Sequence, residues 1–246
     1  MTPPRAVAII PARGGSRGVP RKNVRDFLGR PLLAWSISHA REARPVERII
    51  VSTDDDEIAD VSRQSGAEVI RRPPQLATDQ APSEPAIIHA LESAYPDRAL
   101  MPELVVFLQA TSPIRDPGDV GGAIDLLLRR GADSLVSVTP SHDFLWLDRG
   151  DTAVPLNYNP AHRPRRQDMP ARYRENGSLY VMRTEGLLRH RCRLFGSIAL
   201  YVMDEVRSFQ IDTPGDFAVC EAIASARRIP AKHPHASMSR LARAEA

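Results

Sequence analysis

The chain has 246 residues, of which 42% are hydrophobic and 26% are charged, and these values are those of an ordinary globular protein. It contains no apolar stretch long enough to cross a bilayer and no signal region before the first apolar run, so we expect a cytoplasmic protein with no membrane partner. Without the five basic residues and one acidic residue from position 227 onward, 28 basic and 29 acidic residues remain, and this near-neutral body argues against nucleic acid as a partner.

Apolar runs alternate with amphipathic segments along most of the chain. This alternation predicts a single α/β domain over residues 1–228, with a parallel sheet covered by helices on both faces. The seven predicted strands are residues 6–10, 48–53, 67–70, 104–108, 134–138, 178–181 and 198–202. Residues 229–246 are expected to form a disordered basic tail.

Polar residues mark the starts of four predicted helices. The acidic residues 54–57 suit the positive end of a helix dipole, and residues 213–216 open the last helix. Ser83 and Asp116 are predicted N-caps, the latter with Pro117 at the first helical position. The side chains predicted to face the core are Ile58, Val61, Ile87, Ile88, Leu91, Ile124, Leu127, Leu128, Phe217, Val219 and Ile223.

Residues 141–176 interrupt this pattern with a polar excursion that is rich in proline and arginine. A loop of this length inside a compact domain usually serves a function or an interface. We therefore expect the excursion to act at a surface rather than in the core.

A glycine-rich basic loop follows the first predicted strand, over residues 11–23. Its glycines are Gly14, Gly15 and Gly18, and its cations are Arg13, Arg17, Arg21 and Lys22. A buried strand that ends in glycines and cations directs backbone N–H groups and positive charge at one spot, which suits a polyphosphate. The glycine spacing fits neither G-x-G-x-x-G nor a Walker A loop, so neither a hydride-transfer site nor a P-loop ATPase is supported.

The alternative interpretation of this loop is a solvated turn whose glycines serve only backbone geometry. Four neighbouring cations repel one another unless an anion joins them, and this favours the anion-binding interpretation. In open α/β sheets, ligands bind outside the carboxyl ends of the strands. That rule places three loops on one rim, namely residues 13–23, 72–83 and 109–115.

Three further motifs accompany the basic loop. They are LQATSPIR at 108–115, RYRENGSLY at 172–180 and FQIDT at 209–213, and LATD at 76–79 lies between them and the loop. With this ordered set, from residue 6 to about 225, the chain resembles the acylneuraminate cytidylyltransferase family, the CMP-sialic acid synthetases. The resemblance implies a domain of nucleotide-diphospho-sugar transferase type, with a Rossmann-like mixed, mostly parallel sheet flanked by helices.

The resemblance also implies a reaction. Family members transfer CMP from CTP to the anomeric hydroxyl of a nonulosonic acid and release pyrophosphate, which requires positioning and neutralisation of phosphate charge. By resemblance, Arg13 and Lys22 are the catalytic cations that contact the triphosphate and the leaving pyrophosphate. The nucleotide-binding set implied in this way is Arg13, Gly14, Ser16, Arg17, Lys22, Asn23, Arg72 and Ser83.

Several of these residues have plainer interpretations. Asn23 suits a turn or helix cap, Arg72 suits a surface position before two prolines, and Ser83 suits an N-cap. For these three positions the functional role follows from the resemblance and not from the spacing.

An acidic sugar beside a triphosphate needs a cation of its own. By resemblance, Arg165 and Arg174 bind the sugar carboxylate, while Gln109 and Asn176 contact hydroxyl groups and the acyl amide. The competing interpretations are a solvated arginine-rich loop and, for Gln109, a purely structural hydrogen bond.

The metal position departs from the family pattern. Many members carry Asp-x-Asp there, whereas this chain has Gln210 followed by Ile211 and Asp212. Mg²⁺ needs only one or two protein carboxylates when phosphates and waters complete its octahedron, so Asp212 is the predicted anchor of a Mg²⁺ cofactor. The number of metal ions and the general base stay open.

The resemblance further implies a homodimer with residues 141–176 at its interface, and CTP and an acidic nonulosonate as substrates. The alternatives are activation of legionaminic acid or of an eight-carbon ulosonate such as 3-deoxy-octulosonate, or a catalytically silent CTP-binding module suggested by Gln210.

Overall fold

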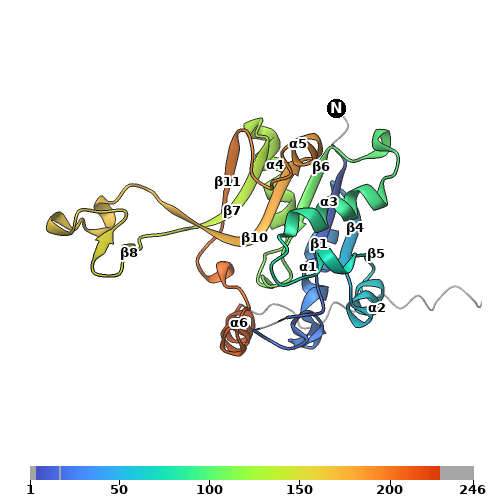
Figure 1. Cartoon of the computed structure of the whole chain (residues 1–246), viewed down its shortest axis with the longest axis horizontal. Coiled ribbons are helices and arrows are strands. Elements are labelled where there is room, and N and C mark those ends of the chain that lie inside the picture. Colours follow the sequence, from blue (N-terminus) through green and yellow to red (C-terminus); the bar gives the residue numbers. More distant parts are fainter. Residues whose placement is uncertain (1–3, 17, 228–246) are drawn as a thin grey trace, which may run out of the picture.

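The computed structural model describes residues 4–16 and 18–227, and within them the chain forms a seven-stranded sheet with the order β11-β7-β10-β6-β1-β4-β5 (Figure 1). The strands are β1 Ala6–Pro11, β4 Val46–Thr53, β5 Glu68–Arg71, β6 Leu104–Leu108, β7 Ser134–Pro140, β10 Tyr173–Arg183 and β11 Ile198–Val202. All seven predicted strands are therefore confirmed. The disordered tail predicted at residues 229–246 lies outside the described residues.

The sheet is mixed because one strand runs against the others. β10 pairs antiparallel with both β6 and β7, while β1 with β4, β1 with β6, β4 with β5, and β7 with β11 are parallel pairs. The chain leaves the carboxyl end of β7 and returns at that same end as β10, which makes an antiparallel pair unavoidable. The mixed, mostly parallel sheet expected from the resemblance is confirmed, and the uniformly parallel sheet expected from the alternation is wrong at β10.

Six α-helices accompany the sheet in the described residues: α1 Leu32–Arg41, α2 Asp56–Gln64, α3 Ser83–Ala94, α4 Asp119–Arg130, α5 Thr184–His190 and α6 Pro214–Ala226. Short 3-10 turns occupy Lys22–Val24, Pro74–Leu76, Arg98–Leu100, Pro160–His162, Arg166–Asp168 and Val206–Ser208. Sequence periodicity missed α1, because nine of its ten residues are buried and it has no polar face to set a pattern.

Strand alternation divides the core into two layers. Ala8 and Ile10 of β1 face the side covered by α1, α2 and α4, and Val7 and Ile9 face the side covered by α3 and α5. A third cluster packs α6 against α1 and the small hairpin of β2 Asp26–Phe27 and β3 Arg30–Pro31. The helices predicted for both faces are thus present.

Two predicted helix caps are wrong. Ser83 is the first residue of α3 and its side chain makes no cap bond, since Pro82 occupies the N-cap position. Asp116 does not cap α4, which begins at Asp119 after Gly118 takes a left-handed conformation with φ of 92°. The N–H of Asp116 instead donates to Asp119 Oδ2 at 2.7 Å, so this turn precedes the helix.

The last helix begins as predicted but faces the core differently. Thr213 and Asp216 form a reciprocal capping box at its start. Val219 is 43% exposed, because it lies two positions from the buried Phe217 and therefore points about 200° around the helix. Cys220 and Ala224 face the core in its place. Of the other predicted core side chains, Val61, Leu128 and Ile223 are half-buried and the rest are buried.

The predicted excursion forms a projecting arm, which we define as residues 141–172 between β7 and β10 (Figure 1). It carries a two-stranded sheet of β8 Trp146–Asp148 and β9 Ala153–Pro155. The rings of Phe144 and Trp146 lie 4.5 Å and 5.9 Å from the ring of Tyr158. β10 starts at Tyr173, so residues 173–176 belong to the sheet and not to the excursion.

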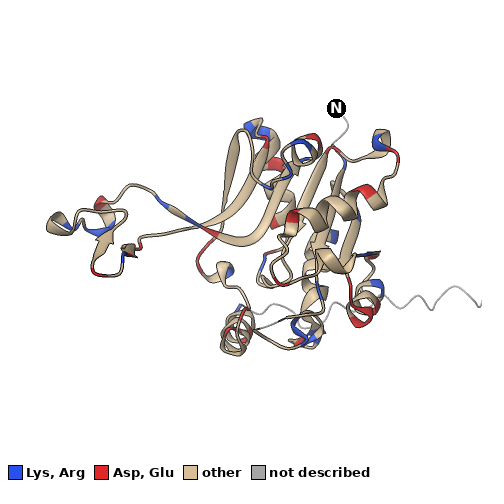
Figure 2. Cartoon of the chain, in the orientation of Figure 1, with Lys and Arg blue, Asp and Glu red and all other residues tan. Residues whose placement is uncertain are grey.

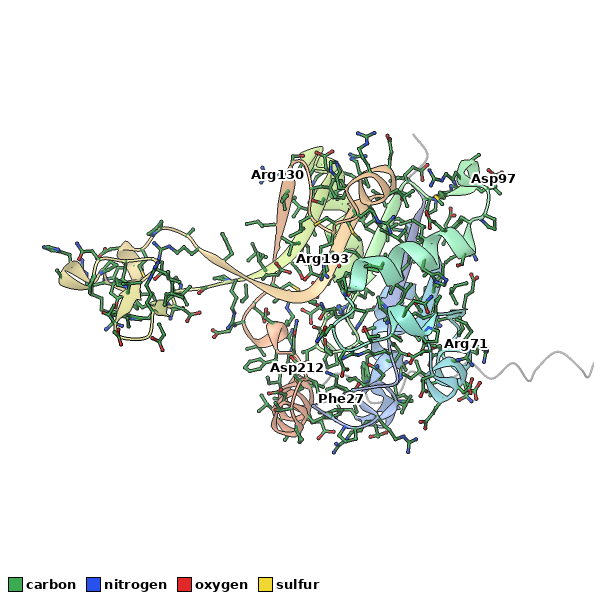
Figure 3. All side chains as sticks on the ribbon, in the orientation of Figure 1. Phe27, Arg71, Asp97, Arg130, Arg193 and Asp212 are labelled. Atoms are coloured by element: carbon green, nitrogen blue, oxygen red, sulfur yellow. The ribbon has the colours of Figure 1, made fainter. Side chains whose placement is uncertain are left out.

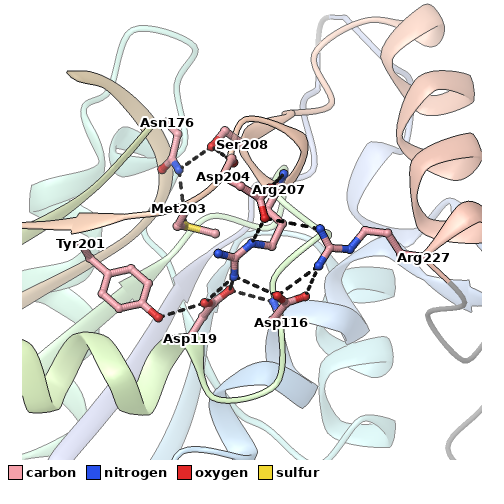
Figure 4. A network of polar contacts seen from close by, with 9 residues as sticks. All are labelled: Asp116, Asp119, Asn176, Tyr201, Met203, Asp204, Arg207, Ser208 and Arg227. Carbon is pink, nitrogen blue, oxygen red and sulfur yellow. Dashed lines mark hydrogen bonds and ion pairs between the residues drawn. The ribbon is translucent and has the colours of Figure 1, made fainter. Parts of the chain in front are cut away.

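An ion network joins the segment after β11 to the start of α4 (Figure 4). The guanidinium of Arg207 contacts Asp119 at 2.7 Å, Asp204 at 2.9 Å and Asp116 at 3.0 Å, and Tyr201 donates to Asp119 at 3.0 Å. Burial acts to lower the pKa of Arg207, but these carboxylates outweigh burial and raise that pKa. The network therefore holds residues 203–213 against the body of the domain.

Replacing Arg207 by alanine is expected to lower the free energy of unfolding by about 3 kcal/mol, because it leaves the buried Asp119 carboxylate without its cation. Urea denaturation measures this loss. The control is Arg63→Ala, which breaks an exposed pair with Asp60 and should change the free energy by less than about 0.5 kcal/mol. Equal losses in the two variants would contradict the role of the network.

Candidate functional site

The predicted rim forms a cavity of about 450 Å³ at the carboxyl ends of β1 and β6. Its lining residues are Pro11, Arg13, Ser16, Gly18, Lys22, Asn23, Ser83, Phe107, Gln109, Ala110, Thr111 and Asp212. Seven of these were predicted site residues, and they come from the basic loop, the start of α3, the LQATSPIR motif and the FQIDT motif. The cavity is thus the meeting point of distant segments, such as those of Lys22 and Asp212, which are 190 residues apart.

Close packing shapes the basic loop. A Cβ atom at Gly18 would lie 1.9 Å from the backbone oxygen of Asp212, so only glycine fits at this contact. Gly14 packs against the acidic start of α2, where its N–H donates to Asp54 Oδ1 at 3.1 Å. Ser16 lines the cavity, whereas Gly14 is turned to the carboxylates, and Arg17 lies outside the described residues.

Lys22 sits at the cavity wall with its side chain 13% exposed. Its ammonium donates to the backbone oxygen of Ile211 at 2.8 Å and to Asp212 Oδ1 at 3.1 Å. Asn23 follows it, is buried, and donates through Nδ2 to the backbone oxygen of Arg13 at 3.0 Å. This bond ties the two ends of the loop together and places Arg13 and Lys22 at the same cavity.

Arg13 reaches from the end of β1 to the LATD motif. Its Nη1 donates to the backbone oxygen of Thr78 at 2.5 Å, and its Nη2 lies 2.9 Å from Asp79 Oδ1. Arg13 and Lys22 are therefore each held by one carboxylate, Asp79 and Asp212 respectively, before any ligand binds. Such preorganised cations need little rearrangement to receive an anion.

Arg72 does not line the cavity. It is buried and donates to the backbone oxygens of Ser52 at 2.7 Å and Leu76 at 3.3 Å, so the interpretation as a surface arginine is wrong. Burial lowers the pKa of Arg72, and the charge of Asp54 acts in the opposite direction. Its position supports the loop that carries Asp79.

The four residues predicted for the sugar lie in different surroundings. Gln109 lines the cavity. Asn176 is buried, with Oδ1 accepting from Ser137 Oγ at 2.6 Å and Nδ2 donating to Ser208 Oγ at 3.0 Å. Arg174 is exposed at the start of β10, and Arg165 lies in the arm with Asp168 at 2.8 Å. Within one chain, neither arginine belongs to the cavity lining.

Arg193 is a neighbour of the site that sequence reasoning missed. It lies between β10 and α3 (Figure 3), with Nε 2.6 Å from Glu84 and its guanidinium 5.1 Å and 5.0 Å from the ring centres of Phe107 and Tyr180. Burial acts to raise the pKa of Glu84, but the hydrogen bond and charge of Arg193 together with backbone hydrogen bonds outweigh burial and lower that pKa. No spacing signal links residues 109 positions apart, although Glu84 follows Ser83 directly.

The donor set at the predicted metal position is small. The Asp212 side chain is 66% exposed and forms an ion pair with the Lys22 ammonium. The Gln210 amide donates to the backbone oxygen of Asn176. Across residues 4–16 and 18–227, no group of three His, Cys, Asp or Glu side chains has the arrangement of a metal site. One carboxylate fits Mg²⁺ when phosphate and water oxygens supply the remaining ligands, so the residues present fit a metal that arrives with a nucleotide.

A larger hollow of about 670 Å³ lies at the opposite ends of the strands, around α5. Its charges are mixed, with Arg98, Arg183 and Arg189 facing Glu103 and Glu185 among others. Arg189 is paired with Glu185 and Arg183 donates to a backbone oxygen. The smaller, cation-lined cavity is therefore the candidate site.

This mixed sheet with cations gathered at its carboxyl edge defines an α/β protein whose cavity suits an anionic ligand. The cytidylyltransferase profile matches residues 7–233, and the chain belongs to this family. It is 37% identical over 218 residues to N-acylneuraminate cytidylyltransferase A of Danio rerio, covering 87% of this chain and 49% of that protein. The chain thus spans about half the length of this relative and of several other curated relatives that it matches.

Two further similarities bear on the fold and size. The Post-translational flagellin modification protein B of Campylobacter coli is 29% identical over 227 residues, which cover 91% of this chain and 96% of that protein. A solved CMP:2-keto-3-deoxy-manno-octonic acid synthetase complexed with CTP superposes with a TM-score of 0.67 at 18% identity, covering 91% and 99% of the two chains. The fold expected from the motifs is thereby confirmed. No helix among the described residues has both the length and the apolar character needed to cross a membrane.

The paired cations predict how the cavity binds polyphosphate. Lys22→Met is expected to weaken the binding of inorganic triphosphate by about 10-fold to 100-fold, since it removes one charge-assisted hydrogen bond. Isothermal titration calorimetry measures the affinity. Arg21→Ala is the matched control, because Arg21 belongs to the same loop but pairs with Glu57 on α2 and is 71% exposed. A similar loss in the control would show that only the general charge of the loop matters.

Proposed function

We propose that this protein transfers CMP from CTP to the anomeric hydroxyl of a sialic-acid-type nonulosonate and releases pyrophosphate. The observation that carries the proposal is the convergence of Arg13 and Lys22 on one cavity that also contains Gln109. Membership of the cytidylyltransferase family and the similarity to proteins named N-acylneuraminate cytidylyltransferase support it. The cytoplasmic location stays a prediction from the sequence.

The chemistry follows from the charges. The sugar oxygen attacks an α-phosphorus that is surrounded by anionic oxygens, so the reaction needs an aligned nucleophile and neutralised phosphates. Arg13 and Lys22 exchange part of their contact with Asp79 and Asp212 for phosphate oxygens and stabilise the charge on the leaving pyrophosphate. Ser83 and Gln109 supply neutral polar groups in the lining of the same cavity.

Mg²⁺ is the proposed cofactor. Asp212 would hold it as the only carboxylate in the cavity lining among the described residues. Bound there with the nucleotide, it would supply further positive charge to the phosphate oxygens. The substitution of Gln210 at the family's second carboxylate supports a site with fewer protein ligands.

We infer a homodimer from the charge of the acidic sugar and from the position of the arm. Arg165 belongs to an arm that projects away from the cavity of its own chain, so a second copy is needed to bring it to a cavity. The arm also exposes large apolar side chains, namely Leu145, Trp146, Leu147 and Leu156. We propose that these side chains pack against the second copy, and that Arg174 and Arg165 serve the sugar carboxylate.

Turnover of a panel of sugars tests the function. Purified protein with CTP, MgCl₂ and an N-acylneuraminate is expected to release pyrophosphate, and Arg13→Ala should lower kcat/KM by about 100-fold or more, as for loss of a charge-stabilising group. The circular dichroism spectrum should stay unchanged in this variant, and Arg21→Ala again serves as the control.

The panel also contains legionaminic acid and an eight-carbon ulosonate. A higher kcat/KM with either would assign the alternative substrate. CTP binding with no pyrophosphate from any sugar would refute the proposed transfer and support the silent nucleotide-binding module, and turnover regained in Gln210→Asp would locate the cause at the metal position.

A measurement of the molecular mass in solution tests the proposed dimer. Size-exclusion chromatography with light scattering is expected to give the mass of two chains for the wild type and of one chain for the Trp146→Asp, Leu156→Asp double variant. Leu100→Asp is the control, because Leu100 is 59% exposed but lies outside the arm. A wild-type mass of one chain would overturn the proposed dimer.

A further inference from the structure

Arg115 is a buried cation that none of the steps above uses. It closes the LQATSPIR motif and is 1% exposed, and it has the largest side chain among the fully buried ones. Among the described residues, no carboxylate forms an ion pair with it. Burying a charge without a counter-charge is unfavourable, so the position calls for an explanation.

Its guanidinium joins three elements through oxygen acceptors. Nη1 donates to Ser36 Oγ of α1 at 3.0 Å. Nη2 donates to the backbone oxygen of Gln109 at 2.8 Å and to the backbone oxygen of Ser178 on β10. Ser36 Oγ in turn donates to the same Gln109 oxygen at 3.3 Å. A single guanidinium thus satisfies the acceptors at which α1, the loop after β6 and β10 meet.

One of the two carbonyl groups belongs to the segment that lines the cavity, and the other belongs to the part of β10 that packs against that segment. Gln109 lines the cavity, and Ser178 follows Gly177, which has a left-handed φ of 64°. A Cβ at Gly177 would lie 3.3 Å from Gln109 Oε1, so the two segments are in close contact. The backbone oxygens of Gln109 and Ser178 turn towards the buried Arg115 guanidinium, and the Gln109 side chain is directed to the cavity.

Arg115 stays positively charged although its side chain is buried. Burial lowers its pKa to about 9, and the charge of Asp119 acts in the opposite direction, so the guanidinium is protonated at neutral pH. A buried cation that meets only neutral acceptors contributes less to stability than a well-packed apolar side chain of similar volume would. Fixing the geometry of these segments is a use that an apolar side chain could not serve.

We propose that Arg115 is a positioning residue for the acceptor sugar, because it ties the Gln109 and Ser178 carbonyls together and thereby sets the Gln109 side chain at the cavity wall. The inference rests on the proposed function, in which Gln109 contacts the sugar. The side chains of Arg13 and Lys22 make their contacts elsewhere, at Thr78, Asp79, Ile211 and Asp212.

The test separates the sugar from the nucleotide. Arg115→Lys keeps the charge but loses the planar fork that reaches two carbonyls at once. The variant is expected to lower kcat/KM for the sugar by about 100-fold, the scale for a small misplacement of a contact group, while the Kd for CTP by calorimetry stays within about twofold. Combined with Gln109→Ala, it should add little to the loss caused by Gln109→Ala alone.

Arg183→Lys is the matched control. Arg183 ends the same strand, β10, and its Nε donates to the backbone oxygen of Ala132 at 3.0 Å, away from the cavity. It should lower stability without changing kcat/KM for the sugar. If Arg115→Lys fails to fold, Ser36→Ala takes its place, with an expected loss of about 10-fold in kcat/KM for the sugar, the lower end of the scale for the charge-assisted hydrogen bond that Ser36 accepts from Arg115.

The outcomes are distinct. An active wild type with unchanged sugar kinetics in Arg115→Lys, or in Ser36→Ala where that variant replaces it, would overturn the positioning role alone. Equal losses for sugar and CTP, or losses that add to those of Gln109→Ala, would assign Arg115 a general structural role and also overturn it. A wild type with no turnover of any sugar would overturn both the function and this inference.

Discussion

Pairing between the basic loop and carboxylates on facing segments is the interaction on which the candidate site depends. Arg13 meets Asp79 and Lys22 meets Asp212, so two cations from one loop are held in place by residues far along the chain. Like charges this close would otherwise repel each other. The two carboxylates are partly exposed and can share their cations with an incoming anion, and the cavity is therefore both stable when empty and ready for phosphate. In Figure 2, basic and acidic residues are interspersed along the chain, so the positive charge of the site is local.

The reversal of the chain between β7 and β10 sets the other half of the architecture. It makes β10 antiparallel, which places the irregular stretch 176–178 of this strand next to Gln109. It also sends the arm outward, where Leu145, Leu147 and Leu156 are exposed. One topological feature thus links the wall of the cavity to the surface proposed for a second copy.

Much of the fold could be predicted because the signals are local. The continuous apolar runs 6–10 and 104–108 identified strands, and their loops then had to share one rim. Prediction failed where the signal was not local. Asp116 has the sequence of an N-cap, but Gly118 adopts a left-handed conformation and Asp116 joins the Arg207 network instead. α1 left no pattern, because burial on all sides removes the polar face that periodicity needs.

The sequence by itself determined the order of strands and helices, the basic loop and the ordered motifs of the family, since these depend on neighbouring residues. Which cations face the cavity and which are buried depends on tertiary packing. Arg13 and Lys22 line the cavity, Arg72 and Arg115 are buried and do not line it, and Arg165 belongs to the arm. The physical reason is that desolvation and hydrogen bonding of a guanidinium depend on groups brought together from distant segments, such as Ser36 and Ser178 around Arg115. Arginines that are identical in the sequence therefore have different roles in the folded protein.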